Sequence, residues 1–294
     1  FMKIMSFISY LIILIISFFF NILPRNVSIV LGKTFGLIIY YVFPIRKKVA
    51  LKNIKENFTE LNNKQHIKIL KNTYIHFGVI FSEFIRQQTL NEKNINAIIN
   101  IDKKIIEKLN KNKGSIIMTG HLGNWEYFLP LFGLNNIKFS IVAQRIRNVY
   151  LNNLFLKIRS FKNVEIIFKN EGKDKMIQAL KNNYHLGLAS DQNAGKKGAR
   201  VKFLNYEISI PKGAAIFHIK TKKPIFIGYC IMKKNYTYEF KLELLDTSNI
   251  DFEKQDAIKE INRKFTKSLE KMIIKYPNQY FWFHRMKNKT EYKK

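Results

Sequence analysis

A histidine and a glutamate stand five positions apart in the segment Gly120-His121-Leu122-Gly123-Asn124-Trp125-Glu126. On a continuous helix, side chains at that spacing diverge by about 140° and do not meet. The two can interact only if His121 lies on a turn and Glu126 in the first turns of the following helix. Gly120 and Gly123 provide the backbone freedom that such a turn requires.

A carboxylate bound to one imidazole nitrogen fixes the tautomer, so the other nitrogen can take a proton from a hydroxyl group. We therefore expect His121 to be a general base and Glu126 to orient it and stabilise its charge. A structural histidine is the alternative for an isolated pair at this spacing. The position of the pair after a strand-like run, between two glycines, favours catalysis.

Strand-like and helical segments alternate after about residue 100. The expected strands are Ser115–Thr119, Phe139–Ala143, Val164–Phe168, Leu186–Ser190, Ile225–Tyr229 and Tyr236–Leu245, the last of them a candidate antiparallel strand. The expected helices are Leu51–Gln88, Tyr150–Ser160, Lys173–Asn182, Lys212–Thr221 and Glu253–Tyr276. This alternation predicts an α/β fold with a central, mostly parallel sheet flanked by helices. Sites in such sheets lie beyond the carboxyl ends of the strands, where His121 and Asp191 stand.

The segment Ile4–Pro24 carries no charge and is about as long as a helix that crosses a membrane. It lacks the small residues of a signal-peptide cleavage site, so we expect an uncleaved transmembrane anchor. Cations are more numerous after this segment than before it, which predicts that the rest of the chain lies in the cytoplasm. The apolar stretch Phe35–Phe43 is too short to span and is either interfacial or a buried helix. We therefore divide the chain into a membrane segment, 1–50, and a cytoplasmic domain, 51–294.

The chain of 294 residues has 51 Lys and Arg against 21 Asp and Glu, a formal charge of +30. Part of this excess could reflect codon usage, because Lys, Asn and Ile recur throughout. The remainder predicts attraction to anionic lipid, phosphorylated substrates or an acidic carrier protein. We expect no nucleic-acid partner, because the basic residues are dispersed and no recognised binding module is present.

No cofactor and no metal are expected either. The chain has one cysteine, Cys230, inside an apolar run typical of a core strand, and its six histidines lack ligand spacing.

Four stretches resemble the lipid A biosynthesis acyltransferases (lauroyl and myristoyl type) of the lysophospholipid acyltransferase superfamily. His121–Glu126 resembles the H-x4-[DE] signature in its full form HLGNWE, and Ser190–Gly195 resembles the DQ segment. Pro211–Ala214 resembles a TPKGPA-like stretch, and Pro277–Arg285 resembles the carboxyl-terminal P-x-QY-x-W-x-HRR element. The matches occur in family order and cover the whole chain. Ile210, in place of a small hydroxyl residue, and Met286, in place of a second Arg, depart from the pattern.

The resemblance implies transfer of a fatty acyl group from an acyl carrier protein thioester to a hydroxyl of a phosphorylated lipid A precursor, as part of lipopolysaccharide biosynthesis at the inner membrane. His121 would be the general base in this His-x4-Glu type of enzyme. The alternatives are a glycerolipid, glycolipid or aminolipid acceptor, a coenzyme A donor, and a non-enzymatic basic membrane-binding protein.

The substrate-binding candidates are polar residues in or near the motifs. They are Arg159, Asp191, Arg145, Asn124, Gln192, Lys196 and Arg200. The family has a functional arginine near Arg159, and Asp191 would bind Arg159 or position substrate. We expect His284 and Arg285 to pack at the sheet edge.

Overall fold

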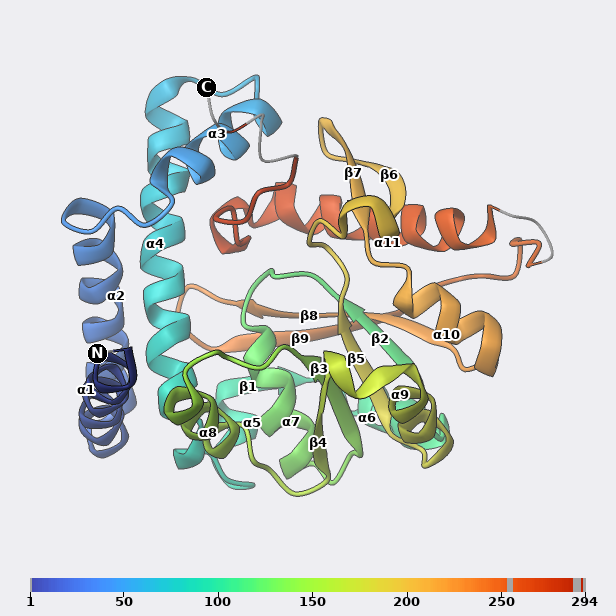
Figure 1. Cartoon of the computed structure of the whole chain (residues 1–294), viewed down its shortest axis with the longest axis horizontal. Helices are drawn as coiled ribbons and strands as arrows, with labels where there is room; N and C mark the ends of the chain where they lie inside the picture. Colours follow the sequence, from blue (N-terminus) through green and yellow to red (C-terminus); the bar gives the residue numbers. More distant parts are fainter. Residues whose placement is uncertain (1, 253–255, 288–291, 293–294) are drawn as a thin grey trace.

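The computed structural model describes residues 2–252, 256–287 and 292, and it confirms the predicted α/β fold (Figure 1). Within these residues the main sheet has seven strands in the order β1-β9-β8-β2-β5-β3-β4. Its strands are β1 (Ile99–Ile101), β2 (Ile116–Thr119), β3 (Phe139–Ala143), β4 (Val164–Phe168), β5 (His185–Ala189), β8 (Ile225–Met232) and β9 (Tyr238–Leu244). The five strands from β8 to β4 run parallel, β9 runs antiparallel to β8, and β1 runs parallel to β9.

Helices cover both faces of the sheet (Figure 1). The α-helices of the described residues are α1 (Met2–Ile22), α2 (Arg25–Tyr41), α3 (Lys47–Asn57), α4 (Asn63–Ile85), α5 (Ile95–Ile98), α6 (Lys103–Lys111), α7 (Phe128–Leu134), α8 (Val149–Ile158), α9 (Gly172–Lys181), α10 (Gly213–Thr221) and α11 (Ala257–Lys275). Among them, α1 and α2 lie away from the sheet, against α8 and α4. A separate antiparallel hairpin, β6 (Ala199–Phe203) and β7 (Tyr206–Ile210), packs on α11.

Strand β2 shows why the sheet needs helices on both sides. Successive side chains of a strand point to opposite faces. Ile116 and Met118 join the core cluster that includes Phe265 of α11, whereas Ile117 joins the cluster that includes Phe132 of α7. All four residues of β2 are buried, as expected for a central parallel strand.

The long helix predicted over Leu51–Gln88 is two helices, α3 and α4. Asn62 ends the break between them because it caps α4: its side-chain oxygen accepts from Gln65 N at 3.0 Å, and Gln65 Oε1 accepts from Asn62 N at 2.8 Å. The predicted start of the last helix at Glu253 lies outside the described residues.

Helix α2 packs along α4, and both stand at the left of Figure 1. The two backbones approach closely because glycines meet at the contact. A Cβ atom added to Gly78 would lie 2.1 Å from the carbonyl oxygen of Gly32. Residues Ile4–Ile22 of α1 form, among the described residues, one helix long and apolar enough to cross a membrane. The division into a membrane segment and a cytoplasmic domain remains a prediction.

Candidate active site

His121 and Asp191 follow two neighbouring parallel strands. The register of β2 and β5 pairs Thr119 with Ala189, and His121 and Asp191 each come two residues later. Parallel strands end at the same edge of the sheet, so this register places the two side chains side by side. His121 Nδ1 lies 2.7 Å from Asp191 Oδ1, and the His121 backbone N–H donates to Asp191 Oδ2 at 2.8 Å.

The contact with Asp191 sets the protonation behaviour of His121. Burial alone would lower the pKa of His121, but the charge and hydrogen bond of Asp191, with a smaller effect of Glu126, raise it above its usual value. Burial likewise opposes ionisation of Asp191, yet His121 holds the pKa of that carboxyl well below its usual range. An ionised Asp191 that accepts Nδ1–H leaves Nε2 unprotonated and able to take a proton.

Glu126 does not bind His121, contrary to our expectation. It lies on the 3-10 turn η2 (Trp125–Tyr127), and Arg159 at the end of α8 donates to it twice, at 2.9 and 2.7 Å. Burial opposes the charge of Arg159, but Glu126 raises the pKa of Arg159 above its usual value. A bidentate pair with a guanidinium is among the strongest contacts open to a carboxylate, which explains why Glu126 binds Arg159. Asp191, and not Glu126, therefore makes the contact with His121 that we expected of Glu126, and it does not bind Arg159.

The turn that carries His121 lies between β8 and the carboxyl-terminal segment and is hydrogen-bonded to both. Gly123 N donates to Gln279 O at 3.0 Å, and Asn124 N donates to Cys230 O at 2.8 Å. Gly123 has φ +67°, and an added Cβ atom would lie 2.1 Å from Cys230 O. Glycine is therefore required here both by the backbone conformation and by the close approach of β8.

The carboxyl-terminal motif completes this support. Phe281 N donates to His121 O at 2.9 Å, and the side chain of Gln279 in turn η5 (Pro277–Gln279) bonds both backbone groups of Met232 in β8. The Pro277–Arg285 motif therefore supports the turn that carries His121. His284 is buried beside His121, with 6.5 Å between the ring centroids, whereas Arg285 is exposed.

Gln192 lies beside the free nitrogen of His121. Its side-chain amide nitrogen is 3.4 Å from Nε2, and the residue is exposed. Asn124, by contrast, is fully buried beneath the turn. The role of Asn124 in substrate binding stays a prediction, and in this structure its side chain presents no exposed surface.

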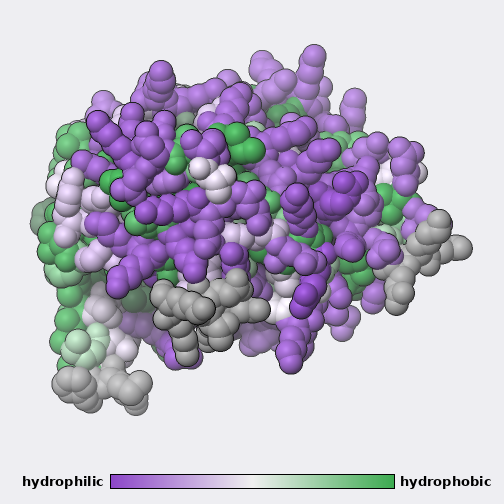
Figure 2. Space-filling model, turned by 90° about the horizontal axis from the view of Figure 1, so that it is seen from above, coloured by the Kyte–Doolittle hydropathy of each residue, from purple (hydrophilic) through white to green (hydrophobic). Residues whose placement is uncertain are grey.

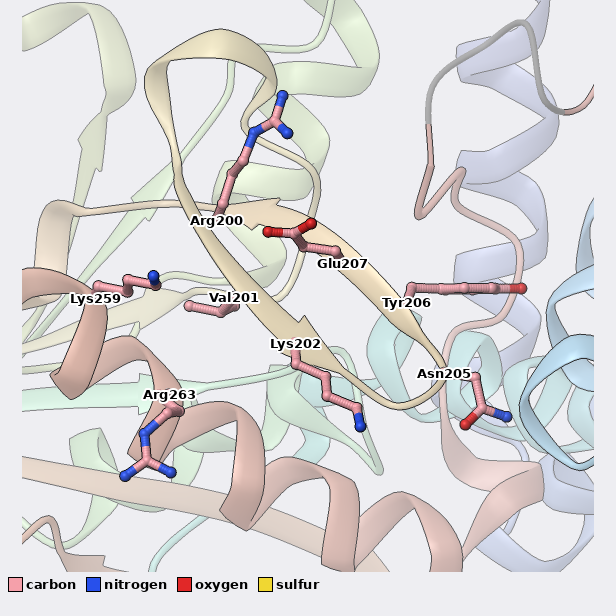
Figure 3. Close-up of a pocket in the computed structure, with 8 residues that line it drawn as sticks. All are labelled: Arg200, Val201, Lys202, Asn205, Tyr206, Glu207, Lys259 and Arg263. Atoms are coloured by element: carbon pink, nitrogen blue, oxygen red, sulfur yellow. The ribbon is translucent and has the colours of Figure 1, made fainter.

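The other basic candidates are exposed. The guanidinium of Arg145 stacks 3.8 Å from the Phe168 ring, and Lys196 lies on the 3-10 turn η4 (Gly195–Lys197) after Asp191. Arg200 lines a groove between the β6–β7 hairpin and α11. In Figure 3 it projects from the hairpin, with Lys202 on the same strand and Lys259 and Arg263 on α11. Arg263 also binds Glu260 of its own helix through two hydrogen bonds.

Across 2–252, 256–287 and 292, no group of three or more His, Cys, Asp or Glu side chains is placed to hold a metal ion. The expectation of a metal-free and cofactor-free reaction stays a prediction.

Sequence reasoning missed the pairing of His121 with Asp191, although one signal pointed to it. Both residues follow the ends of predicted parallel strands, His121 by two residues and Asp191 by one, so pairing of these strands as neighbours would have brought them together. It also missed the contribution of Gln279, whose backbone and side chain link the turn to β8.

Comparisons with known proteins identify the family of this chain. Residues 1–288 match the family model described as bacterial lipid A biosynthesis acyltransferase. The phosphatidylinositol mannoside acyltransferase of Mycolicibacterium smegmatis is 23% identical over 137 residues. That match covers 45% of this chain and 45% of the relative. Since the family model covers nearly the whole chain, including His121, Asp191 and the carboxyl-terminal motif, this protein belongs to the bacterial lipid A biosynthesis acyltransferase family.

Proposed function

We propose that the protein is an O-acyltransferase that moves a fatty acyl chain from an acyl carrier protein thioester to a hydroxyl of a lipid A precursor. The family supports lipid acyl transfer. The observation that carries the proposal is the contact of His121 Nδ1 with Asp191 at 2.7 Å, because it leaves Nε2 available as a base.

In the proposed reaction, Nε2 of His121 takes the proton of the acceptor hydroxyl while the oxygen attacks the thioester carbonyl. The new C–O bond gives a tetrahedral oxyanion, which collapses as the C–S bond breaks. The imidazolium then returns its proton to the thiolate, so the products are an ester and a free thiol. Asp191 stabilises the imidazolium between the two steps. Gln192, beside Nε2, is placed to donate a hydrogen bond to a substrate oxygen.

The basic groove shown in Figure 3 supports a protein donor. Its charged lining residues are four cations, Arg200, Lys202, Lys259 and Arg263, and one carboxylate, Glu207. Acyl carrier protein is acidic, so a cationic groove would speed its encounter with the enzyme. A coenzyme A thioester is the alternative donor, and its phosphates would also meet these cations.

A lipid acceptor other than lipid A is the second candidate. The Mycolicibacterium smegmatis relative is named for phosphatidylinositol mannoside, a glycolipid. A glycolipid, glycerolipid or aminolipid acceptor therefore remains within the same proposed chemistry. The charge of +30 favours an acceptor that carries phosphate.

We place the reaction at the cytoplasmic face of the inner membrane. The uncharged helix α1 supports membrane attachment, and the cations that follow it would be attracted to the anionic lipids of the cytoplasmic leaflet.

The test is a product assay. Purified protein in mixed vesicles is given a labelled acyl carrier thioester or acyl coenzyme A, together with a lipid A precursor, a phosphatidylinositol mannoside or a lysophospholipid. Mass spectrometry then identifies the acylated lipid.

We expect ester formation on the lipid A precursor with the carrier-protein donor, and its loss in His121→Ala. Glu171→Gln, an exposed carboxylate on another helix, is the control and should retain activity. An acylated product formed only from another lipid would contradict the proposed acceptor. Activity of His121→Ala equal to that of the wild type would contradict the proposed mechanism.

A further inference from the structure

Helix α1 contacts the catalytic domain along its length. Asn148, which caps α8, donates to Ser9 Oγ at 3.0 Å. Twelve residues further along the helix, Asn21 Nδ2 donates to the carbonyl oxygen of Ile85 at the end of α4, at 3.2 Å. Ser17 Oγ donates to the same oxygen at 3.2 Å. These polar residues share one side of α1, so that side faces protein from the second turn to the last.

The opposite side of α1 is apolar and exposed. Ile8, Ile12, Ile15 and Phe19 follow the spacing of a single helical stripe, and each is more than 40% exposed. Exposed apolar side chains continue onto α2, beginning at Val27. A continuous surface of this kind on a folded protein marks an interaction site.

Both helices lie along the same face of the molecule. In Figure 1, α2 is seen from the side at the left edge, whereas α1 is seen nearly end-on below it. In Figure 2, viewed from above, hydrophobic atoms gather along that left edge and hydrophilic atoms cover most of the remainder. A flat layer placed against this face would therefore touch both helices lengthwise.

We infer that α1 lies in the plane of an anionic lipid leaflet, with this apolar face among the acyl chains, and does not cross the bilayer. A crossing α1 that kept its contacts would draw α8 into the hydrocarbon, together with the exposed Arg147 and Lys157 that flank or end that helix. A crossing α1 that separated from α8 and α4 would lose its bonds with Asn148 and Ile85. The cations Arg46 and Lys48, both exposed after α2, favour an anionic surface.

This placement does not depend on acyl transfer, but it has a consequence for the site. α8 carries Arg159 at its end, and α4 contributes Phe77, whose ring is 5.9 Å from that of Trp125 in the catalytic turn. The elements that contact α1 and α2 thus also line the region around His121. A lipid acceptor held in the same leaflet would need to travel only along the membrane surface.

The depth of α1 in the bilayer distinguishes the two arrangements. Single cysteines replace Ile8, Ile15 and Ile22, which share the exposed stripe, and carry a fluorescent label in the full chain bound to vesicles of phosphatidylglycerol and phosphatidylethanolamine. Lipids with quenchers at shallow or deep acyl positions report depth. Native Cys230 is fully buried and lies away from the label sites. An in-plane helix predicts equal, shallow depths at all three positions, roughly 5–10 Å below the headgroups. A deep Ile15 label between two shallower ones would overturn the inference.

Cross-linking provides the second measurement. Ser9→Cys with Asn148→Cys should be joined by a short bifunctional thiol reagent while the protein is membrane-bound. The matched pair Ile15→Cys with Asn148→Cys should not, because Ile15 is exposed and lies about 120° around the helix from Ser9. Failure of the first pair in membranes would show that α1 has left the domain. Absence of lipid quenching together with a stable dimer in solution would assign the apolar face to a second copy of the chain and also contradict the inference.

Discussion

At the scale of single residues, the choice of carboxylate partner decides the chemistry of His121. Two carboxylates are near it, but only Asp191 bonds to Nδ1, whereas Glu126 is neutralised by Arg159. The sequence spacing could not separate them, because a five-residue separation within a turn permits several side-chain directions. The motif thus pointed to His121 as the proposed base, and the register of β2 with β5 shows the carboxylate that binds it.

Replacing Asp191 and Glu126 in turn by the corresponding amide should therefore lower kcat by unequal amounts. Asp191→Asn removes the charge that supports the imidazolium, and we expect kcat to fall by about 10²- to 10⁴-fold, the usual range for general base catalysis. Glu126→Gln keeps a hydrogen-bond acceptor for Arg159, so we expect its fall in kcat to be at least about tenfold smaller than that of Asp191→Asn. A fall of that size corresponds to the weakening of one ion pair. Steady-state rates with a saturating thioester donor measure both. A larger loss in Glu126→Gln would return the partner role to that residue.

At the scale of elements, β3 and β4 were predicted to the residue, because each is a short β-branched run between clear turns. The β6–β7 hairpin was missed because its turn lacks glycine. Leu204 has φ +54°, and its N–H donates to Glu270 Oε1 of α11, so a tertiary contact supports a turn with no local sequence signal. The break between α3 and α4 could have been predicted from Asn62 and Gln65, which form a capping box at the start of α4.

The catalytic turn depends on β8 passing directly behind Gly123. Gly123→Ala would force a left-handed alanine and a contact of 2.1 Å with Cys230 O. We expect a loss of about 1–3 kcal/mol in unfolding free energy, as for other overpacked sites, and a loss of activity because His121 is two residues away. Gly213→Ala is the control, since its nearest contact would be 3.8 Å. Thermal unfolding of both variants measures the difference, and an unshifted Gly123→Ala would contradict this account of the turn.

At the scale of the whole molecule, the positive charge is spread over the surface, but one groove concentrates it. Composition predicted the attraction to anions, and only the fold brings Arg200 of the hairpin near Lys259 of α11. In the same way, hydropathy predicted a membrane segment at residues 4–24. It could not separate crossing from in-plane insertion, because that difference depends on what Ser9, Ser17 and Asn21 contact.

Charge reversal in the groove tests the donor. We expect Arg200→Glu with Lys202→Glu to lower kcat/KM for acyl carrier protein about 10-fold or more at low salt, with a weaker effect at high ionic strength. Lys93→Glu with Lys181→Glu makes the same change of net charge on other exposed elements and should have little effect. An equal loss in both double variants would mean that net charge, not the groove, attracts the carrier protein.

The pH dependence of kcat/KM in wild type and Asp191→Asn tests the central claim, a base formed by His121 and Asp191, most directly. The neutral imidazole is the active form, and Asp191 raises the pKa of His121, so wild-type activity should fall as the pH drops through a value above about 6.5. In Asp191→Asn, burial without the carboxylate lowers the pKa of His121, so the residual activity should persist to lower pH. An acid limb that does not move, or that moves instead in Glu126→Gln, would contradict the account.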